Sequence, residues 1–163
     1  MDQYIQDREF DGKSNGTSIV RGDYENCHFR NCSFANLDLS GYNFTECEFE
    51  ACDLSTSKIV NTGFKDVLFR NCKLLGLSFD TCSDFLLALQ FIDCLLNFSS
   101  FSQLKIHHTS FINCSLQEVD FTKADLSGSS FEESDLAGAI FQGTRLEKCN
   151  FRNALNYSFH PEE

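Results

Sequence analysis

Large apolar residues recur at every fifth position from Phe111 to Phe151. Each of these nine positions is Phe or Leu, and the residue two places before it is small or medium in size. A period of five matches neither the 3.6-residue repeat of an α-helix nor the two-residue repeat of a strand. It fits a chain that turns a corner every five residues and buries one large side chain each time. Internal repetition of this kind outranks local secondary-structure preferences in predicting a fold.

The same period runs through most of the chain. Regular centres extend from Tyr24 to Phe79, the in-frame position Asp84 breaks the rule, and the pattern resumes at Leu86. We therefore expect two inserted residues, which form a bulge near residues 81–85. Taking every fourth centre as one wall then gives columns of uniform composition, one of which contains only phenylalanine: Phe29, Phe49, Phe69, Phe91, Phe111, Phe131 and Phe151.

Four corners of five residues predict a 20-residue coil and an all-β solenoid. The 26 centres predict about six and a half coils, in a rod roughly 31 Å long at the spacing of neighbouring strands. We assign residues 1–18 to an N-terminal cap, residues 19–155 to the solenoid with its bulge, and residues 156–163 to a C-terminal tail. A cap is expected because the end of a stack of coils presents unpaired backbone.

The repeats KADLS, ESDLA and KCNFR resemble the A(D/N)Lxx signature of the pentapeptide-repeat family, and the resemblance covers residues 22–155. It implies a right-handed quadrilateral β-helix with four pentapeptides per coil. The course of the chain from FLLALQFIDC to the C-terminus is also similar to bacterial members that protect DNA gyrase from toxins or from quinolones, a form of antibiotic resistance. That likeness implies a DNA mimic with an acidic surface and a C-terminal dimer.

The formal net charge of −11 disfavours direct binding to nucleic acid or to an anionic membrane and suits a basic protein partner. Two groups of acids are the candidate partner surface: Glu25, Glu46, Glu48 and Glu50, then Glu132, Glu133 and Asp135. One explanation is that these acids keep a repeat rod soluble. The other is that they imitate DNA towards a basic cleft, with DNA gyrase as the partner.

A belt of apolar residues around the bulge occupies positions that normally face outward. Its members are Leu75, Phe85, Leu87, Ile92, Leu95, Phe98 and Ile112. Contiguous exposed apolar surface usually marks an interaction site, so the alternative function is a general protein-interaction scaffold with no role at gyrase. The bulge could instead fold over these residues and cover them.

The C-terminal end offers a second contact surface. The tail is too short for a helix of useful stability, and two coils meeting end to end would bury Tyr157 and Phe159 together. We predict a two-fold dimer through this end. The alternative is a monomer whose end is covered by tail residues or by sequence beyond Glu163.

Nothing in the sequence indicates catalysis. No phosphate-binding glycine loop, nucleophile elbow or metalloprotease motif occurs, and a filled β-helix has no lumen for a converging site. The nine cysteines follow the small positions of the repeat, where cysteine behaves as a small buried hydrophobe. Their odd number favours reduced thiols in a cytoplasmic protein, and the acidic N-terminal residues lack the features of a signal peptide. We expect no enzymatic activity, no cofactor and no metal.

Overall fold

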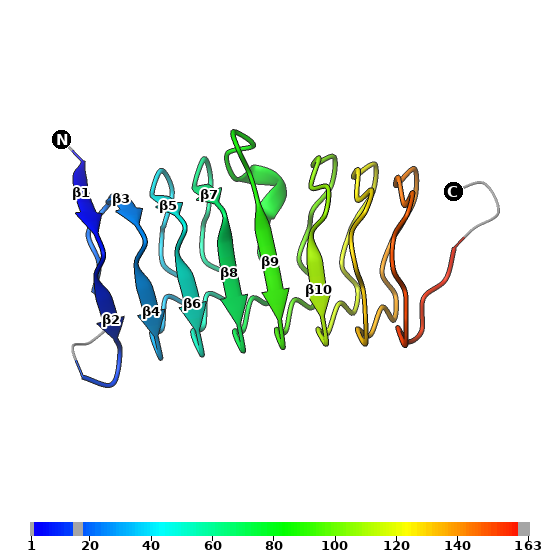
Figure 1. Ribbon diagram of the computed structural model, residues 1–163, viewed down its shortest axis with the longest axis horizontal. Helices are drawn as coiled ribbons and strands as arrows, with labels where there is room; N and C mark the ends of the chain where they lie inside the picture. Colours follow the sequence, from blue (N-terminus) through cyan, green and yellow to red (C-terminus); the bar gives the residue numbers. More distant parts are fainter. Residues whose placement is uncertain (1, 15–17, 160–163) are drawn as a thin grey trace.

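The computed structural model describes residues 2–14 and 18–159. The chain forms a rod of stacked coils, with the N-terminus at one end and the C-terminus at the other (Figure 1). The elements are β1 (Gln3–Gln6), β2 (Glu9–Asp11), β3 (Gly22–Glu25), β4 (His28–Arg30), β5 (Asn43–Thr45), β6 (Glu48–Glu50), β7 (Gly63–Lys65), β8 (Val67–Arg70), the 3-10 helix η1 (Phe79–Thr81), β9 (Leu89–Ile92) and β10 (Ser110–Ile112).

All named strands pair in parallel. One sheet has the order β1-β3-β5-β7 and the other the order β10-β9-β8-β6-β4-β2. Phe44 pairs with Phe64, the fourth centre after it, and isolated parallel bridges carry the same step onward to Asp135 and Leu155. The predicted all-β solenoid with four centres per coil is therefore confirmed. Its right-handedness and the number of coils stay predictions.

The core is a set of aromatic columns that run along the rod. The predicted phenylalanine wall is confirmed: from Phe29 to Phe151, successive rings stack with centroids 4.7–5.4 Å apart and interplanar angles of 1–15°. A second column runs from Phe79 to Phe141 with spacings of 4.7–5.5 Å. Offset stacking adds to the free energy gained from burying apolar area, so each coil is held by the coils on both sides.

Where the residue two places before a centre is cysteine, serine or threonine, it usually also has a bonding role. Its side chain donates to the carbonyl of a centre in the previous coil: the Cys72 thiol reaches the Phe49 oxygen at 3.2 Å, and the Ser134 hydroxyl reaches the Phe111 oxygen at 2.7 Å. Cysteine, serine and threonine suit this position because they are small and carry a donor. The same bond recurs along the rod, so it ties successive coils together.

The corner residue two places after a centre usually has a left-handed backbone. Asn31, Ala51 and Glu133 have φ angles of 53°, 54° and 61°. Asparagine and glycine tolerate this region best, which explains their frequency at corners. These side chains point away from the core, so the corners are free to vary in charge.

The register changes within the segment from Ser83 to Leu89, close to the bulge expected near residues 81–85. The regular spacing persists as far as Ser83, whereas Val67 pairs with Leu89, two positions beyond the partner that the regular spacing would give. The prediction of Leu86 as a core centre is wrong: it takes a left-handed corner position, with a φ of 52°, and is 65% exposed. Leu89 is buried, and Leu87, which was expected to face outward, packs partly against the core.

The N-terminal segment continues the solenoid by strand pairing. β1 pairs with β3 and β2 pairs with β4, and Phe10 stacks on Phe29 at 4.9 Å. The division into cap, solenoid and tail stays a prediction, and residues 15–17 and 160–163 of the predicted cap and tail lie outside the described residues. The described part of the chain has no helix with the length and apolar character that a membrane crossing needs.

Candidate interaction surfaces

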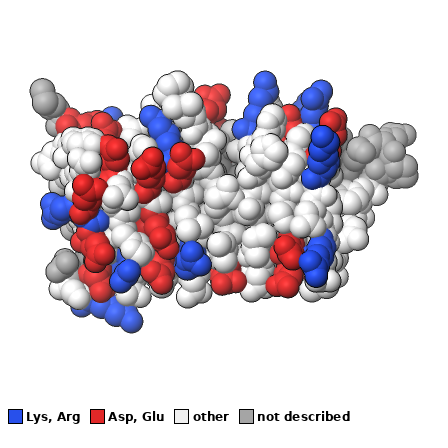
Figure 2. All heavy atoms as spheres, viewed as in Figure 1, with Lys and Arg blue, Asp and Glu red and all other residues white. Residues whose placement is uncertain are grey.

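Every described aspartate and glutamate lies on the outside of the rod, because the buried polar residues are all serine or threonine. On the face shown in Figure 2, acidic atoms are most frequent over the half nearest the N-terminus, with basic atoms among them. The outward positions are therefore where any charged partner would bind. The two acidic groups predicted from the sequence differ in how much of their charge is free.

Basic neighbours neutralise half of the N-terminal acidic group. Glu48 and Glu50 lie on β6, where parallel pairing places arginines of β4 and β8 beside them. The Arg70 Nε lies 3.3 Å from Glu48, and the Arg30 Nε lies 3.4 Å from Glu50. Such exposed ion pairs add little stability, but they remove much of the negative potential that a basic partner would sense.

The free acids in this part of the rod lie at the corner that follows β5 and β7. Glu46 is exposed at a left-handed position, and Asp66 takes the equivalent position one coil further along. Neither forms an ion pair within the described residues. Glu25 is half-buried and accepts a hydrogen bond from the Tyr4 hydroxyl, and this bond raises the pKa of Tyr4 to about 12. Glu46 and Asp66 therefore carry the free charge of this corner.

The C-terminal acidic group is remote from the first. Successive coils bring Glu50, Arg70, Ile92, Ile112 and Glu132 into one column. Four steps of about 4.8 Å place Glu132 roughly 19 Å from Glu50 along the rod. The two groups thus do not form one surface.

Within the C-terminal group, Glu133 is exposed and Asp135 is bound by its neighbours. The Asn156 amide donates to Asp135 at 2.9 Å and the Gln117 amide donates at 2.7 Å. These hydrogen bonds lower the pKa of Asp135. The Asp135 carboxylate therefore supports the last coils as well as contributing charge.

A histidine joins two of the acids on the six-stranded sheet. Ligand atoms of His28, Glu48 and Glu50 lie within 4.8 Å of one another, and the His28 Nε2 is 3.3 Å from a Glu50 oxygen. This cluster was missed in the sequence, although residues one full coil apart are neighbours in a solenoid. Both glutamates are already paired with arginine, so a metal would have to displace those pairs.

The predicted apolar belt separates into two patches. We define the apolar face as Leu75, Ile92, Leu95, Phe98 and Ile112. Leu95 and Phe98 are 43% and 68% exposed, and the other three are half-buried. Phe85 and Leu87 precede the first residue of β9, whereas Ile92 is its last residue, so the length of β9 separates them from Ile92. The Phe85 ring lies 5.1 Å from the Lys65 Nζ.

The family follows from the repeat itself. The description "Pentapeptide repeats" matches residues 114–153 in eight copies, and "Pentapeptide repeat region" matches residues 23–84. Together the two matches cover more than half of the chain. The chain is a pentapeptide repeat protein. No curated protein matches its sequence.

Solved structures similar to this pentapeptide repeat protein include QnrB1, a plasmid-mediated fluoroquinolone resistance protein. A trypsin-treated form of QnrB1 is 20% identical with a TM-score of 0.43, and 91% of each chain is covered. HetL, which is involved in heterocyst differentiation regulation in the cyanobacterium Nostoc, is 14% identical with a TM-score of 0.35, covering 92% of this chain and 88% of HetL. Rfr23 from the cyanobacterium Cyanothece is 13% identical with a TM-score of 0.33, covering 90% and 86%. These matches assign no partner to this chain.

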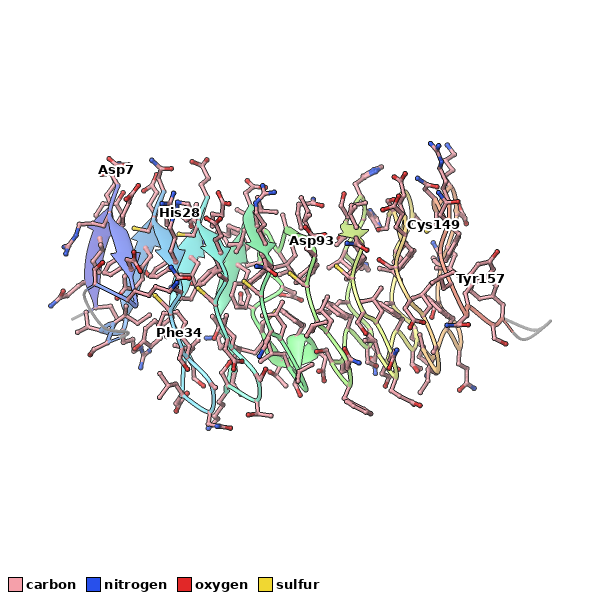
Figure 3. All side chains as sticks on the ribbon, turned by 90° about the horizontal axis from the view of Figure 1, so that it is seen from below. Asp7, His28, Phe34, Asp93, Cys149 and Tyr157 are labelled. Carbon is pink, nitrogen blue, oxygen red and sulfur yellow. The ribbon has the colours of Figure 1, made fainter. Side chains whose placement is uncertain are left out.

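The thiols of this pentapeptide repeat protein are arranged in rows. Sulfur atoms follow one another along the rod (Figure 3). All nine cysteines are free, and only Cys149 is not fully buried. Burial raises the pKa of Cys47 and of Cys82 to about 12. A nucleophilic thiol requires the thiolate form, so these groups fill the core and donate hydrogen bonds.

The C-terminal end is partly covered by the chain's own tail (Figure 3). The Tyr157 ring lies 5.5 Å from the Phe151 ring, and the Phe159 ring lies 5.2 Å from the Phe141 ring. Tyr157 is 47% exposed and Phe159 is 39% exposed. The two candidate dimer residues therefore pack on their own last coil and leave part of their surface open. Dimerisation through this end stays a prediction.

Proposed function

We propose that this protein works by binding rather than by catalysis. Its acidic corner, formed by Glu46 and Asp66, takes the place of DNA in a basic cleft of DNA gyrase. The observation that carries the proposal is the pair Glu46 and Asp66. These side chains repeat their negative charge at equivalent positions of neighbouring coils, and no arginine or lysine of the described residues pairs with them. The similarity of the chain's course to gyrase-protecting members points to the same partner.

Charge density argues for a local mimic. The described residues have a formal net charge of −9, because Glu162 and Glu163 lie outside them. This charge is spread along a phenylalanine column of seven steps from Phe10 to Phe151. At about 4.8 Å per step the column is roughly 34 Å long, which gives about one net charge per 4 Å. Duplex DNA carries one per about 1.7 Å. The whole rod is too weakly charged to imitate a duplex, so the interaction is assigned to the acidic corner.

A gyrase assay tests this function. Purified gyrase would be assayed for supercoiling and for binding to the protein, with and without a quinolone and at two salt concentrations. We expect binding that weakens steeply with salt, and a loss of at least tenfold in affinity for the double variant Glu46→Lys and Asp66→Lys. The matched control is Glu132→Lys with Glu133→Lys, which makes the same change of charge at the remote group. Absence of binding at low salt, or equal losses in both variants, would contradict the proposal.

A second function is favoured by the apolar face. Phe98 projects from a left-handed corner with a φ of 65° and is 68% exposed, and Leu95 lies beside it on the outward side of the wall. Exposed apolar surface of this kind binds apolar partner surface. A scaffold that works through this face would lose its partner in the variant Leu95→Lys with Phe98→Glu and keep it in Glu46→Lys with Asp66→Lys. A gyrase-binding mimic would give the reverse result.

The chemistry of the thiols fits a cytoplasmic location for either function. Stacked, reduced cysteines are compatible with a reducing compartment, and Cys47 and Cys82 are held in the protonated form by burial. Thiol labelling immediately after lysis under acid quench measures their state in the cell. Recovery of the cysteines as disulfides would contradict a cytoplasmic location.

A further inference from the structure

A basic hollow lies on the C-terminal half of this acidic rod. It has a volume of about 370 Å³ and includes Lys105, Lys123, Asp125 and Arg145 in its lining. Parallel β-bridges of the backbone pair Lys105 with Asp125 and Asp125 with Arg145. These three residues therefore follow one another on the outward side of one wall. Lys123 occupies the neighbouring corner, at a left-handed position with a φ of 58°.

The hollow exists because small residues lie among long ones. Gly143 takes the corner position that follows Lys123 one coil later, and it has a φ of 67°. A Cβ at Gly143 would come within 3.3 Å of the Lys123 Cγ, so glycine leaves room for the lysine stem beside it. Ala124 adds a second short side chain to the lining.

The charges of the hollow are unbalanced towards the positive. Within the described residues, neither Lys105, Lys123 nor Arg145 forms an ion pair. Asp125 is the one acid in the lining, and the His107 Nε2 lies 2.7 Å from its carboxylate. Three permanent cations therefore face one carboxylate whose hydrogen-bonding capacity is already in use.

The hydrogen-bond donors around the Asp125 carboxylate explain why it does not neutralise the lysines. One of its oxygens accepts the Ser127 amide at 3.1 Å and the Ser127 hydroxyl at 2.7 Å. With the His107 contact, these donors hold the carboxylate against its own wall. An anion that enters the hollow would approach from the side of Lys123 and Gly143, away from Asp125.

We propose that the hollow binds the diphosphate group of a small phosphorylated molecule. Its volume lies within the range of small-molecule sites, about 300–1,000 Å³. Arginine binds phosphate oxygens through its planar fork, and lysine binds them as a point charge. The three cations are spread over two coil steps, about 10 Å along the rod, so a diphosphate is better suited than a single phosphate to contact more than one of them. This site is independent of the acidic corner and of any partner bound there.

Calorimetric titration of the full chain with inorganic pyrophosphate tests the site. Parallel titrations use ADP and adenosine, because a diphosphate can be a free ion or part of a nucleotide. We expect saturable one-to-one binding of pyrophosphate, ADP or both, and none of adenosine. Stronger binding of ADP assigns a nucleotide, and stronger binding of pyrophosphate assigns the free ion.

Three variants locate the binding. Lys123→Gln and Arg145→Gln should each weaken it about tenfold or more, the usual effect of losing one charge-assisted hydrogen bond. Lys58→Gln is the matched control, because Lys58 is an exposed cation that does not line the hollow. Melting temperatures confirm that each variant is folded. Equal weakening in all three variants would mean non-specific screening and would overturn the proposal.

Asp125→Asn gives a test of opposite sign. The amide oxygen can still accept from Ser127, but the negative charge in the hollow is gone, so diphosphate binding should tighten severalfold. Amide NMR shifts on titration should centre on Ala124 and Gly143. Unchanged or weaker binding in Asp125→Asn, shifts centred elsewhere, no saturable binding of either diphosphate, or saturation by an acidic peptide alone would each overturn the assignment.

Discussion

Replacing Phe111 with alanine should destabilise the rod strongly. Phe111 is fully buried, with the Phe91 and Phe131 rings stacked on its two sides at 5.1 and 5.2 Å. The Phe101 and Phe121 rings meet it edge-on at 5.5 and 5.7 Å. Truncation removes all four contacts and leaves a cavity, so we expect a loss of about 3–5 kcal/mol in the free energy of unfolding. In a chain of this length the melting temperature should fall by about 10 °C.

The matched control is Phe151→Ala in the same column. Phe151 is only partly buried and stacks on one coil, through Phe131 at 5.1 Å, with its other side against the tail. Urea unfolding followed by circular dichroism measures both variants, and an unchanged m-value shows that the loss is in stability alone. If Phe111→Ala cost no more than Phe151→Ala, stacking from both sides would not be what holds a coil.

Three further predictions concern backbone contact, acid stability and thiol access. Gly22→Ala should release β1, because the added Cβ would lie 2.4 Å from the Gln3 carbonyl oxygen, and hydrogen exchange in β1 should accelerate. Gly76→Ala should leave the exchange of β1 unchanged, because a Cβ at Gly76 would lie 3.5 Å from its nearest neighbour, the Thr56 Cγ2. Hydrogen bonds from Ser127 and His107 lower the pKa of Asp125 to about 2. Its contribution to stability is therefore present above the unfolded pKa of about 4 and is lost as the pH falls towards 2, and denaturant unfolding of Asp125→Asn should show a shallower acid dependence. In the native protein Ellman's reagent should label Cys149 first, because the other cysteines are buried; rapid native labelling of all nine would refute the predicted protection.

The parts of the fold that repeat with the pentapeptide were predictable. Each Phe or Leu centre carries its own burial signal, and the length of one coil follows from comparing centres such as Phe91, Phe111 and Phe131. A solenoid brings only neighbouring coils together, so periodicity translates directly into contacts. The aromatic columns needed no information beyond the order of the residues.

The irregular segment was less predictable, for a physical reason. Leu86 and Leu89 are equally apolar, and the sequence alone does not show which one takes a left-handed corner. Backbone hydrogen bonding decides it: the regular pattern runs through Ser83 and resumes at Leu89. A corner residue points outward whatever its hydrophobicity, which is why Leu86 is exposed.

The charged surfaces required the register. Glu50 lies between Arg30 and Arg70 in one column, so counting acids along the chain overstates the free charge of the first group. The basic hollow was also missed, because Lys123 and Arg145 are far apart in the sequence and become neighbours only when the coils stack. Its signal in the sequence is Gly143, a short residue at a corner where neighbouring coils have longer ones.

The hydrogen bonds from cysteine, serine and threonine at the small positions to centres of the previous coil have an evolutionary consequence. Because the donor and acceptor recur in every coil, a segment of one complete coil can be duplicated or deleted and the new neighbours still find matching partners. Selection can therefore lengthen or shorten such a rod one coil at a time, by about 4.8 Å, without redesigning its interior. The insertion between Ser83 and Leu89 interrupts this exchange, since a duplication across it would also copy the irregular segment. The rod therefore consists of two stretches that can each grow independently.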